Sequence, residues 1–331
     1  TMGMLSLPSM IKAGYDQKIA TGTICAAGTL GQIIPPSIVL VLLATILQGA
    51  NEEAAMLKGD LAPDPVTAID LFAGALLPGL MLVVMFIIFI YIYARIFPNT
   101  CPPIKTDKSR IEIYKEAFKS IFPPLILIIL VLGSILMGVA TPTESASVGA
   151  VGAAIIAFAK GELTFQNLKE VSLNTVKLSS FVFVILIGAS MFSLVFRGFN
   201  GDAMIEHFLG SLPGGLFTAL LIVMVAIFIL GFFLDYIEII FVIVPLVGPI
   251  LIANGADPLW LGILISLNLQ TSFLTPPFGF SLFFLRGVAP KEIQTRNIYR
   301  GVMPYIGIQV LAIIIVAMFP SIATWLPNLM F

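Results

Sequence analysis

Histidine and cysteine are nearly absent from this chain, and charged residues are few. The sequence has one histidine, His207, and two cysteines, Cys25 and Cys101. One histidine cannot form a histidine-based metal site, and we identify no Ser/His/Asp triad. The two cysteines lie on segments that we place far apart, so we expect neither a disulfide nor a metal cluster.

Charge is nearly balanced as well as scarce. The 17 basic and 18 acidic residues give a net charge of −1, which offers no support for a nucleic-acid partner. Hydrophobic residues make up 59% of the chain, charged residues 11%, and the mean hydropathy is +1.07. Apolar stretches of about 18 residues or more recur, so the sequence predicts an all-α polytopic membrane protein.

One apolar stretch is interrupted at its centre by polar residues and two prolines. Residues 267–279 combine amide and hydroxyl side chains with a proline pair and a glycine, inside a mostly apolar segment, 259–286. The proline pair removes two N–H donors and clashes with the preceding turn, so the helix must break near Thr275. Many secondary transporters build their sites at such mid-membrane breaks; the simpler interpretation is a harmless proline kink.

A second copy of this pattern lies near the beginning of the sequence. Residues 28–37 are again polar and rich in glycine, inside an apolar segment, 19–47. A gapless shift of 241 residues superimposes five pairs of proline, glycine and aspartate: Pro8 with Pro249, Gly14 with Gly255, Asp16 with Asp257, Pro35 with Pro276 and Pro36 with Pro277. We interpret the two segments as an internal repeat, which favours a transporter over a chance pair of kinked helices.

The remaining apolar segments predict the other membrane elements. Residues 1–11 are too short to span and are interpreted as the second arm of a re-entrant hairpin. Spans are expected at 71–94, 121–139, 145–159, 179–196 and 302–319, and residues 110–120 are expected to lie along the interface. Two further apolar segments, 216–234 and 236–252, flank Asp235. A carboxylate is better placed at a tip buried in protein than facing lipid, so we interpret 216–252 as a second re-entrant hairpin.

Lysine and arginine placement sets the orientation, because cytoplasmic loops carry the excess of these residues. The basic segments 95–120, 160–177 and 286–300 are therefore placed in the cytoplasm, and the acidic loop 48–70 is placed outside. The first broken span then runs outward and the second runs inward. Such an inverted repeat has a pseudo-two-fold axis in the membrane plane, and it predicts a site at the midplane where the broken helices meet.

Four short motifs follow one another along the chain. They are Gly31–Ser37, Ala140–Ser145, Gly231–Asp235 and Leu274–Gly279. In sequence and in order they resemble the large membrane subunit of tripartite ATP-independent periplasmic (TRAP) transporters, over essentially all of the chain.

The sequence departs from the family pattern at a few positions. Ser272 stands where a glycine is common, and Ala140 stands where a phenylalanine is common. The family usually has a first hairpin tip, rich in glycine and serine, just before the position of Thr1. We therefore expect the N-terminal part of the full protein, with half of one ion site, to lie outside this sequence.

The resemblance implies a sodium-coupled, elevator-type importer with the inverted-repeat fold of the ion-transporter superfamily, and not an enzyme. Such a subunit lies in the bacterial or archaeal inner membrane, works with a small membrane subunit, and receives its substrate from a periplasmic binding protein. Substrates are mostly small organic acids, and no cofactor is expected apart from Na⁺ as the coupling ion. Transport-domain segments are expected at 1–47 and 216–286, mainly scaffold spans and interfacial helices at 48–215, and an interfacial segment with a scaffold span at 287–331.

Na⁺ prefers oxygen ligands, from carbonyls at helix breaks, hydroxyls and carboxylates. For the second repeat we predict an ion site at Gly231, Asp235, Thr275 and Gly279. The matching part of the first repeat comprises Gly28, Thr29, Gly31, Pro35 and Ser37. Substrate contacts are predicted at Asn268, Gln270, Thr271, Ser272, Pro36, Pro276 and Pro277. Half-helix N-termini near Ser37 and Gly279 would favour an anionic group.

Several of these residues also have a purely structural interpretation. Asp235 can instead hydrogen-bond neighbouring backbone, and the polar run 268–272 can instead join helices. Glu144 is interpreted first as a helix-capping residue, because Thr-Pro-Thr-Glu begins a helix well. Glu238 is a second acid inside the membrane, and such groups are functional candidates by default.

Other functions stay open at this point. The nearest is a proton-coupled carrier that uses Asp235, and a passive channel or a membrane enzyme is more distant. A channel needs polar residues along whole helices, and an enzyme needs an acid/base or metal constellation beyond Asp235 and Glu238. Arg197 and His207 are expected to be solvated loop residues that can touch the binding protein.

Overall fold

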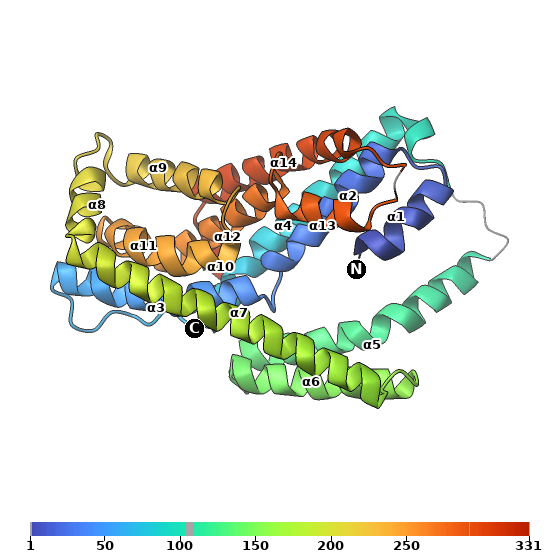
Figure 1. The fold of residues 1–331 in the computed structure, drawn as a ribbon, viewed down its shortest axis with the longest axis horizontal. Coiled ribbons are helices and arrows are strands. Elements are labelled where there is room, and N and C mark those ends of the chain that lie inside the picture. Colours follow the sequence, from blue (N-terminus) through green and yellow to red (C-terminus); the bar gives the residue numbers. More distant parts are fainter. Residues whose placement is uncertain (1, 104–108, 291, 331) are drawn as a thin grey trace. The chain divides into compact units, whose positions relative to one another are not determined.

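The computed structural model describes residues 2–103, 109–290 and 292–330, and within these ranges every regular element is a helix (Figure 1). Among the described residues, 7 helices are long and apolar enough to cross a membrane. They are Ile38–Lys58, Ala68–Ile96, Ile111–Leu136, Pro142–Ala159, Phe165–Gly198, Tyr236–Ala253 and Thr295–Met318. The prediction of an all-α polytopic membrane protein is therefore confirmed.

The chain forms two compact units. One contains Thr1–Pro102 and Gly188–Phe331, and the other contains Pro103–Ile187. Both proline-broken spans and the hairpin around Asp235 lie in the first unit, so the candidate site is built from that unit alone. The division into transport and scaffold segments stays a prediction.

The first broken span begins and breaks close to where its sequence predicts. α1 (Met2–Lys12) and α2 (Gln17–Thr29) are followed by a 3₁₀ turn, Leu30–Gln32, and α3 (Ile38–Lys58) begins after the proline pair. Asp16 caps α2, because its carboxylate accepts a hydrogen bond from the Lys18 N–H at 2.8 Å. Gly14, with φ of 86°, makes the turn that precedes this cap.

Part of the segment expected to form the acidic outer loop is helical. α3 continues through residues 48–58, which are rich in alanine and other strong helix formers, and it ends at Gly59 with φ of 75°. The loop between α3 and α4 (Ala68–Ile96) is therefore shorter than 48–70. Thr67 and Asp70 form a capping box at the start of α4.

The second broken span has the same order of elements. α9 (Gly215–Leu230), a short α10 (Tyr236–Glu238), a π-helical turn (Ile239–Ile243) and α11 (Val244–Ala253) form a hairpin, with Asp235 where the chain reverses. α12 (Pro258–Leu274) and α13 (Phe280–Val288) follow on either side of the break. Asp257 caps α12 through the Trp260 N–H at 2.8 Å, and Gly255 has φ of 103°. These residues repeat the roles of Asp16 and Gly14.

α14 (Thr295–Met318) packs along α2. At their closest approach a Cβ on Gly22 would overlap the carbonyl of Gly301, and a Cβ on Gly301 would overlap the carbonyl of Lys18. Only glycine permits this backbone contact, which is typical of close helix packing in membranes. α15 (Ser321–Met330) follows α14 and packs on α4.

Contacts with α14 also fix the directions of the two broken helices. Three hydrogen bonds join α14 to α2 in the same order along both helices: Asn297 to Gln17 at 2.7 Å, Thr23 with Tyr305 at 2.6 Å, and Gln309 to Thr29 at 3.2 Å. α2 is therefore parallel to α14. The start of α12 lies beside the end of α14, because Trp260 Nε1 donates to the Val316 carbonyl at 2.8 Å. Farther along α12, Gln270 lies beside the earlier Gln309 of α14, since both donate to the Thr29 hydroxyl. It follows that α2 and α12 run in opposite directions.

The second unit contains longer helices than the sequence predicts. α5 (Arg110–Leu136) joins the expected interfacial segment to the following span in one helix, which begins with a Ser109–Glu112 capping box. α6 (Pro142–Ala159) follows, and its capping box of Thr141 and Glu144 confirms the capping role of Glu144. α7 (Phe165–Gly198) takes in most of the segment expected as a basic loop, 160–177, and ends in the first unit.

Candidate functional site

Both breaks contain a cis proline pair, Pro35–Pro36 in the first repeat and Pro276–Pro277 in the second. In the first break a side chain satisfies a free carbonyl. Ser37 Oγ donates to the Gln32 carbonyl at 2.6 Å, and it accepts from the Leu40 N–H at 3.5 Å as the cap of α3. Ser37 thus joins the two halves of the broken helix.

In the second break, α12 ends at Leu274 and Thr275 is its C-cap, as predicted. Thr275 Oγ1 donates to the Thr271 carbonyl at 2.7 Å, and the Gly279 N–H donates to the Thr275 carbonyl at 3.0 Å. Gly279 lies so close to the chain before it that a Cβ would stand 2.7 Å from the Phe273 carbonyl oxygen. Glycine is therefore required there by close backbone approach.

The hairpin tip packs directly on the second break. A Cβ on Gly231 would lie 2.7 Å from the Ser272 Cβ and closer still to its Oγ. Aromatic rings extend this contact, with centroid distances of 5.5 Å between Phe233 and Phe278 and 6.0 Å between Tyr236 and Phe273. The structure therefore brings the tip, 231–236, to the break, 272–279, as a second-repeat ion site requires.

Asp235 lies at this tip and is half-buried. Its carboxylate accepts the Tyr236 N–H at 2.7 Å, and the carboxylate of Glu238 accepts the Asp235 N–H at 3.1 Å. The two acids form a capping box on α10, so both have a structural role. Their predicted functional roles stay predictions.

The polar run of α12 is buried in the protein. Thr271 and Ser272 hydrogen-bond carbonyls of their own helix, those of Leu267 at 2.7 Å and Leu269 at 2.9 Å. Asn268 reaches another helix instead, because its amide donates to the Met224 carbonyl of α9 at 2.7 Å. In this conformation, the side chains of these three residues have protein partners, as the structural interpretation of the run expects.

Gln270 is different because it meets the first repeat. Its amide nitrogen donates to Thr29 Oγ1 at 3.3 Å, and Gln309 of α14 donates to the same oxygen at 3.2 Å. Thr29 in turn donates to the Ala26 carbonyl at 2.9 Å. Thr29 and Gln270 are equivalent positions under the 241-residue shift. The two repeats therefore meet at matching residues where the broken helices cross.

This crossing contains buried oxygens with no partner among the described residues. Thr29, Gln270 and Gln309 are at most 2% exposed, and the carbonyl oxygens of both glutamine side chains lack a hydrogen bond. An unpaired buried carbonyl is unfavourable by about 1–3 kcal/mol. These oxygens are thus able to accept a hydrogen bond or bind a small cation.

Sequence reasoning missed Gln309. It lies inside an apolar span and belongs to none of the four motifs. The sequence feature that indicates its role is the four-residue spacing of Asn297, Gly301, Tyr305 and Gln309, which places these residues on one helix face. Each of them contacts α2.

Two of the predicted residues of the first repeat, Gly28 and Thr29, border a cavity. A cavity of about 510 Å³ is lined in part by Gly28, Thr29 and Gln32 from the first repeat and by Phe273 and Ser281 around the second break. Among the described residues, no group other than the adjoining backbone lies within 4 Å of a Cβ built on Gly28 or Gly31. Among the described residues, a hairpin tip therefore covers the second break and not the first, in keeping with the expectation that half of the first ion site lies outside this sequence.

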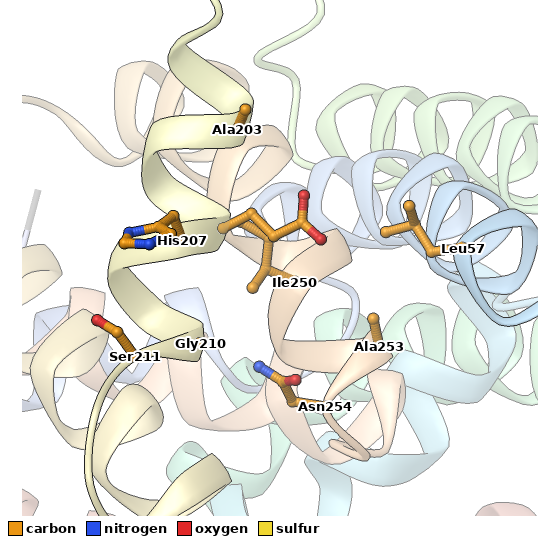
Figure 2. Close-up of a pocket in the computed structure, with 9 residues that line it drawn as sticks. Leu57, Ala203, His207, Gly210, Ser211, Ile250, Ala253 and Asn254 are labelled. Carbon is orange, nitrogen blue, oxygen red and sulfur yellow. The ribbon is translucent and has the colours of Figure 1, made fainter.

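Two other residues differ from expectation. Arg197 is not a free loop residue: it ends α7 and forms ion pairs with Glu53 at 3.1 Å and Asp202 at 3.2 Å. His207 lies on α8 (Gly201–Gly210), where it lines a surface groove with Ser211 (Figure 2).

Comparisons with known proteins agree with this arrangement. A family model described as "Tripartite ATP-independent periplasmic transporter, DctM component" matches residues 1–322. The chain belongs to this family. TRAP large subunits are multi-pass proteins of the bacterial inner membrane that work with a small membrane subunit and a periplasmic binding protein. The family members compared with this chain are named as transporter permeases and not as enzymes.

Three relatives show how far the similarity extends. The C4-dicarboxylate TRAP transporter large permease of Vibrio cholerae is 32% identical over 350 residues, covering 99% of this chain and 72% of the relative. The protein of the same name in Pseudomonas aeruginosa is 31% identical over 328 residues, covering 99% and 71%. The sialic acid TRAP transporter permease of Haemophilus influenzae is 27% identical over 332 residues, covering 99% and 50%.

Proposed function

We propose that this TRAP large subunit imports a small organic acid, driven by a sodium gradient and supplied by a periplasmic binding protein. The observation that carries the proposal is the crossing of two oppositely directed, proline-broken helices at Thr29 and Gln270. Broken helices that cross inside the protein place backbone carbonyls, hydroxyls and half-helix ends around one point, which is the arrangement that ion-coupled transport uses.

The proposed substrate class is a carboxylate. Two of the relatives named above transport C4-dicarboxylates by name, and a third transports sialic acid, which is also a carboxylic acid. In this chain α3 and α13 both begin immediately after a break, at Ile38 and Phe280. Helix N-termini carry partial positive charge, so both half-helices favour an anion beside the breaks.

The proposed sodium site of the second repeat comprises Gly231, Asp235, Thr275 and Gly279. Hydroxyl, carboxylate and break-region carbonyl oxygens are available there, and the hairpin tip lies against the break. Gly28, Thr29, Gly31, Pro35 and Ser37 are proposed to contribute the equivalent site of the first repeat. We propose an elevator movement, in which inverted repeats exchange conformations to expose the site on either side.

A proton-coupled carrier of the same fold is the alternative, and Asp235 favours it. A half-buried carboxylate beside a second acid, Glu238, is suited to binding and releasing a proton. A passive channel has less support, because the polar side chains of α12 gather near the break and hydrogen-bond within the protein.

Uptake in proteoliposomes tests the proposal. The complete large subunit with its small subunit is reconstituted, binding protein is added outside, and uptake of candidate carboxylates is measured under sodium, pH or no gradient. The proposal expects uptake only with both a sodium gradient and the binding protein. Uptake driven by pH alone would select the proton-coupled alternative. Uptake that is the same with and without each gradient would overturn both the sodium-coupled and the proton-coupled proposals.

A further inference from the structure

We infer that the groove between α8 and α11 is where a basic segment of the periplasmic binding protein docks. The groove has a volume of about 540 Å³ and lies within the first unit. Figure 2 shows α8 forming one wall, the C-terminal end of α11 forming the floor, and Leu57 at the end of α3 on the far side. Among its lining residues, Glu206 bears the negative charge.

The groove combines an apolar floor with a polar rim. Ile250 in the floor is 8% exposed, whereas Glu206, His207 and Asn254 around it are exposed. Within the described part of the chain, the side chains of these three rim residues form no hydrogen bond or ion pair. An open groove with an apolar base and unpartnered polar groups around it has the character of a protein contact surface.

The wall of the groove is held in place by a charged link. Arg197 at the end of α7 pairs with Glu53 of α3 at 3.1 Å and with Asp202 of α8 at 3.2 Å. Leu209 of α8 is 4% exposed and anchors the helix on the protein. These contacts attach α8 to α3 and to the rest of the first unit, so the wall of the groove is supported within the unit.

The charge of this end of the unit favours a basic partner. Acidic residues outnumber basic ones around the ends of α3, α8 and α11: Glu52, Glu53, Asp60, Asp64, Asp70, Asp202, Glu206 and Asp257. The basic residues there are Lys58, which donates to the Ile252 carbonyl at 2.8 Å, and Arg197, which is paired with Glu53 and Asp202. Basic residues gather at the opposite end, around the α1–α2 turn and the start of α14: Lys12, Lys18, Arg95, Arg286, Arg296 and Arg300. Cytoplasmic segments carry the basic excess, so the groove faces outward, where the binding protein arrives.

A contact at this groove acts on the candidate site through α11. Ile250 and Ala253 of the floor belong to the hairpin arm that follows Asp235. A docked segment therefore touches the outer end of the hairpin whose tip carries Gly231 and Asp235. A basic side chain near Glu206 would give complementary charge, which raises the association rate and makes it sensitive to salt.

The test measures docking directly and pairs each groove variant with a matched control. Binding protein is titrated onto the complete complex in nanodiscs, at low and at high salt. Glu206→Lys reverses the charge in the groove, and Asp64→Lys makes the same change on the acidic end outside it. Ala203→Trp fills the groove from α8, and Met204→Trp adds the same bulk to the neighbouring position, which does not line the groove.

We expect Glu206→Lys and Ala203→Trp each to raise the dissociation constant about tenfold, a typical loss at a central contact. The two controls should change it less than about twofold, and Glu206→Lys should reduce its salt dependence. Any other pattern, including equal effects of Glu206→Lys and Asp64→Lys, places docking elsewhere and overturns the inference. The inference rests on the binding-protein-dependent import proposed above. Because docking is measured without transport, failed uptake and failed docking remain distinguishable.

Discussion

The two breaks share a pattern in sequence and backbone but differ in their surroundings. Each has a cis proline pair, an aspartate that caps the helix before it, and a left-handed glycine ahead of that cap. The second break is covered by the hairpin tip, with Gly231 against Ser272. The first has open space beside Gly28 and Gly31 and borders a cavity. A shared local pattern therefore sets where each helix breaks, and among the described residues a hairpin tip covers the second break only.

The largest difference is expected from adding one methyl group to each repeat. Gly231→Ala would force the hairpin tip away from Ser272, whereas Gly31→Ala adds a methyl group to open space. We expect Gly231→Ala to destabilise the protein by about 1–3 kcal/mol, as for an overpacked core, and Gly31→Ala to have little effect. The thermal unfolding midpoint of the purified proteins measures both.

Ser272→Gly provides the control for this comparison. It removes the side chain that the added methyl group would meet, so Gly231→Ala with Ser272→Gly should recover most of the lost stability. If the double variant is as unstable as Gly231→Ala alone, contact with Ser272 is not the cause. If Gly31→Ala is equally damaging, the two breaks do not differ in packing as described.

The second prediction concerns the point where the repeats meet. Thr29→Val keeps the shape of Thr29 but leaves the amide groups of Gln270 and Gln309 without their shared acceptor. We expect a loss of stability of about 1–3 kcal/mol. Thr29→Ser, which keeps the hydroxyl, is the matched control and should stay near the wild type.

A double-mutant cycle separates the two glutamines. Gln309→Leu removes one donor and one unpaired oxygen, so its own effect should be smaller than that of Thr29→Val. The double variant Thr29→Val with Gln309→Leu should lose less stability than the sum of the losses in the two single variants. Additive effects would show that Gln309 and Thr29 do not interact.

The smallest expected effect is at the cap of α3. Ser37→Ala removes the hydroxyl that joins Gln32 to the start of α3, which should lower stability by about 1 kcal/mol. Ser37→Thr should retain most of it. A loss well above that of Thr29→Val would mean that the cap, and not the crossing, stabilises the first repeat.

Sequence alone predicted the features that depend on local chemistry. The proline pairs located both breaks, and Thr141 with Glu144 marked a helix start. Helix limits were less well predicted in the polar segments. Residues 48–58, 110–120 and 165–177 extend neighbouring helices, because hydropathy identifies the part of a helix that lies in lipid and not where the helix ends.

Contacts between distant segments could not be predicted. The meeting of Thr29 with Gln270 depends on how α2 and α12 cross, and the role of Gln309 depends on the glycine contact of α2 with α14. Asn268, Thr271 and Ser272 were polar candidates by composition, but whether each bonds its own helix or another depends on the direction of its side chain.

Sodium-specific stabilisation of the purified protein tests the proposed ion site most directly. A ligand that binds only the folded state raises the unfolding midpoint, so NaCl should stabilise the wild type more than KCl at equal ionic strength. The part of the stabilisation that comes from the second-repeat site should be lost in Thr275→Ala and in Asp235→Asn, which keeps a good helix cap, so that a clearly smaller sodium-specific shift remains. The full shift should persist in Thr275→Ser. Two results would contradict a sodium site at the second break. One is a sodium-specific shift in Thr275→Ala and Asp235→Asn as large as in the wild type, and the other is no sodium-specific shift in the wild type.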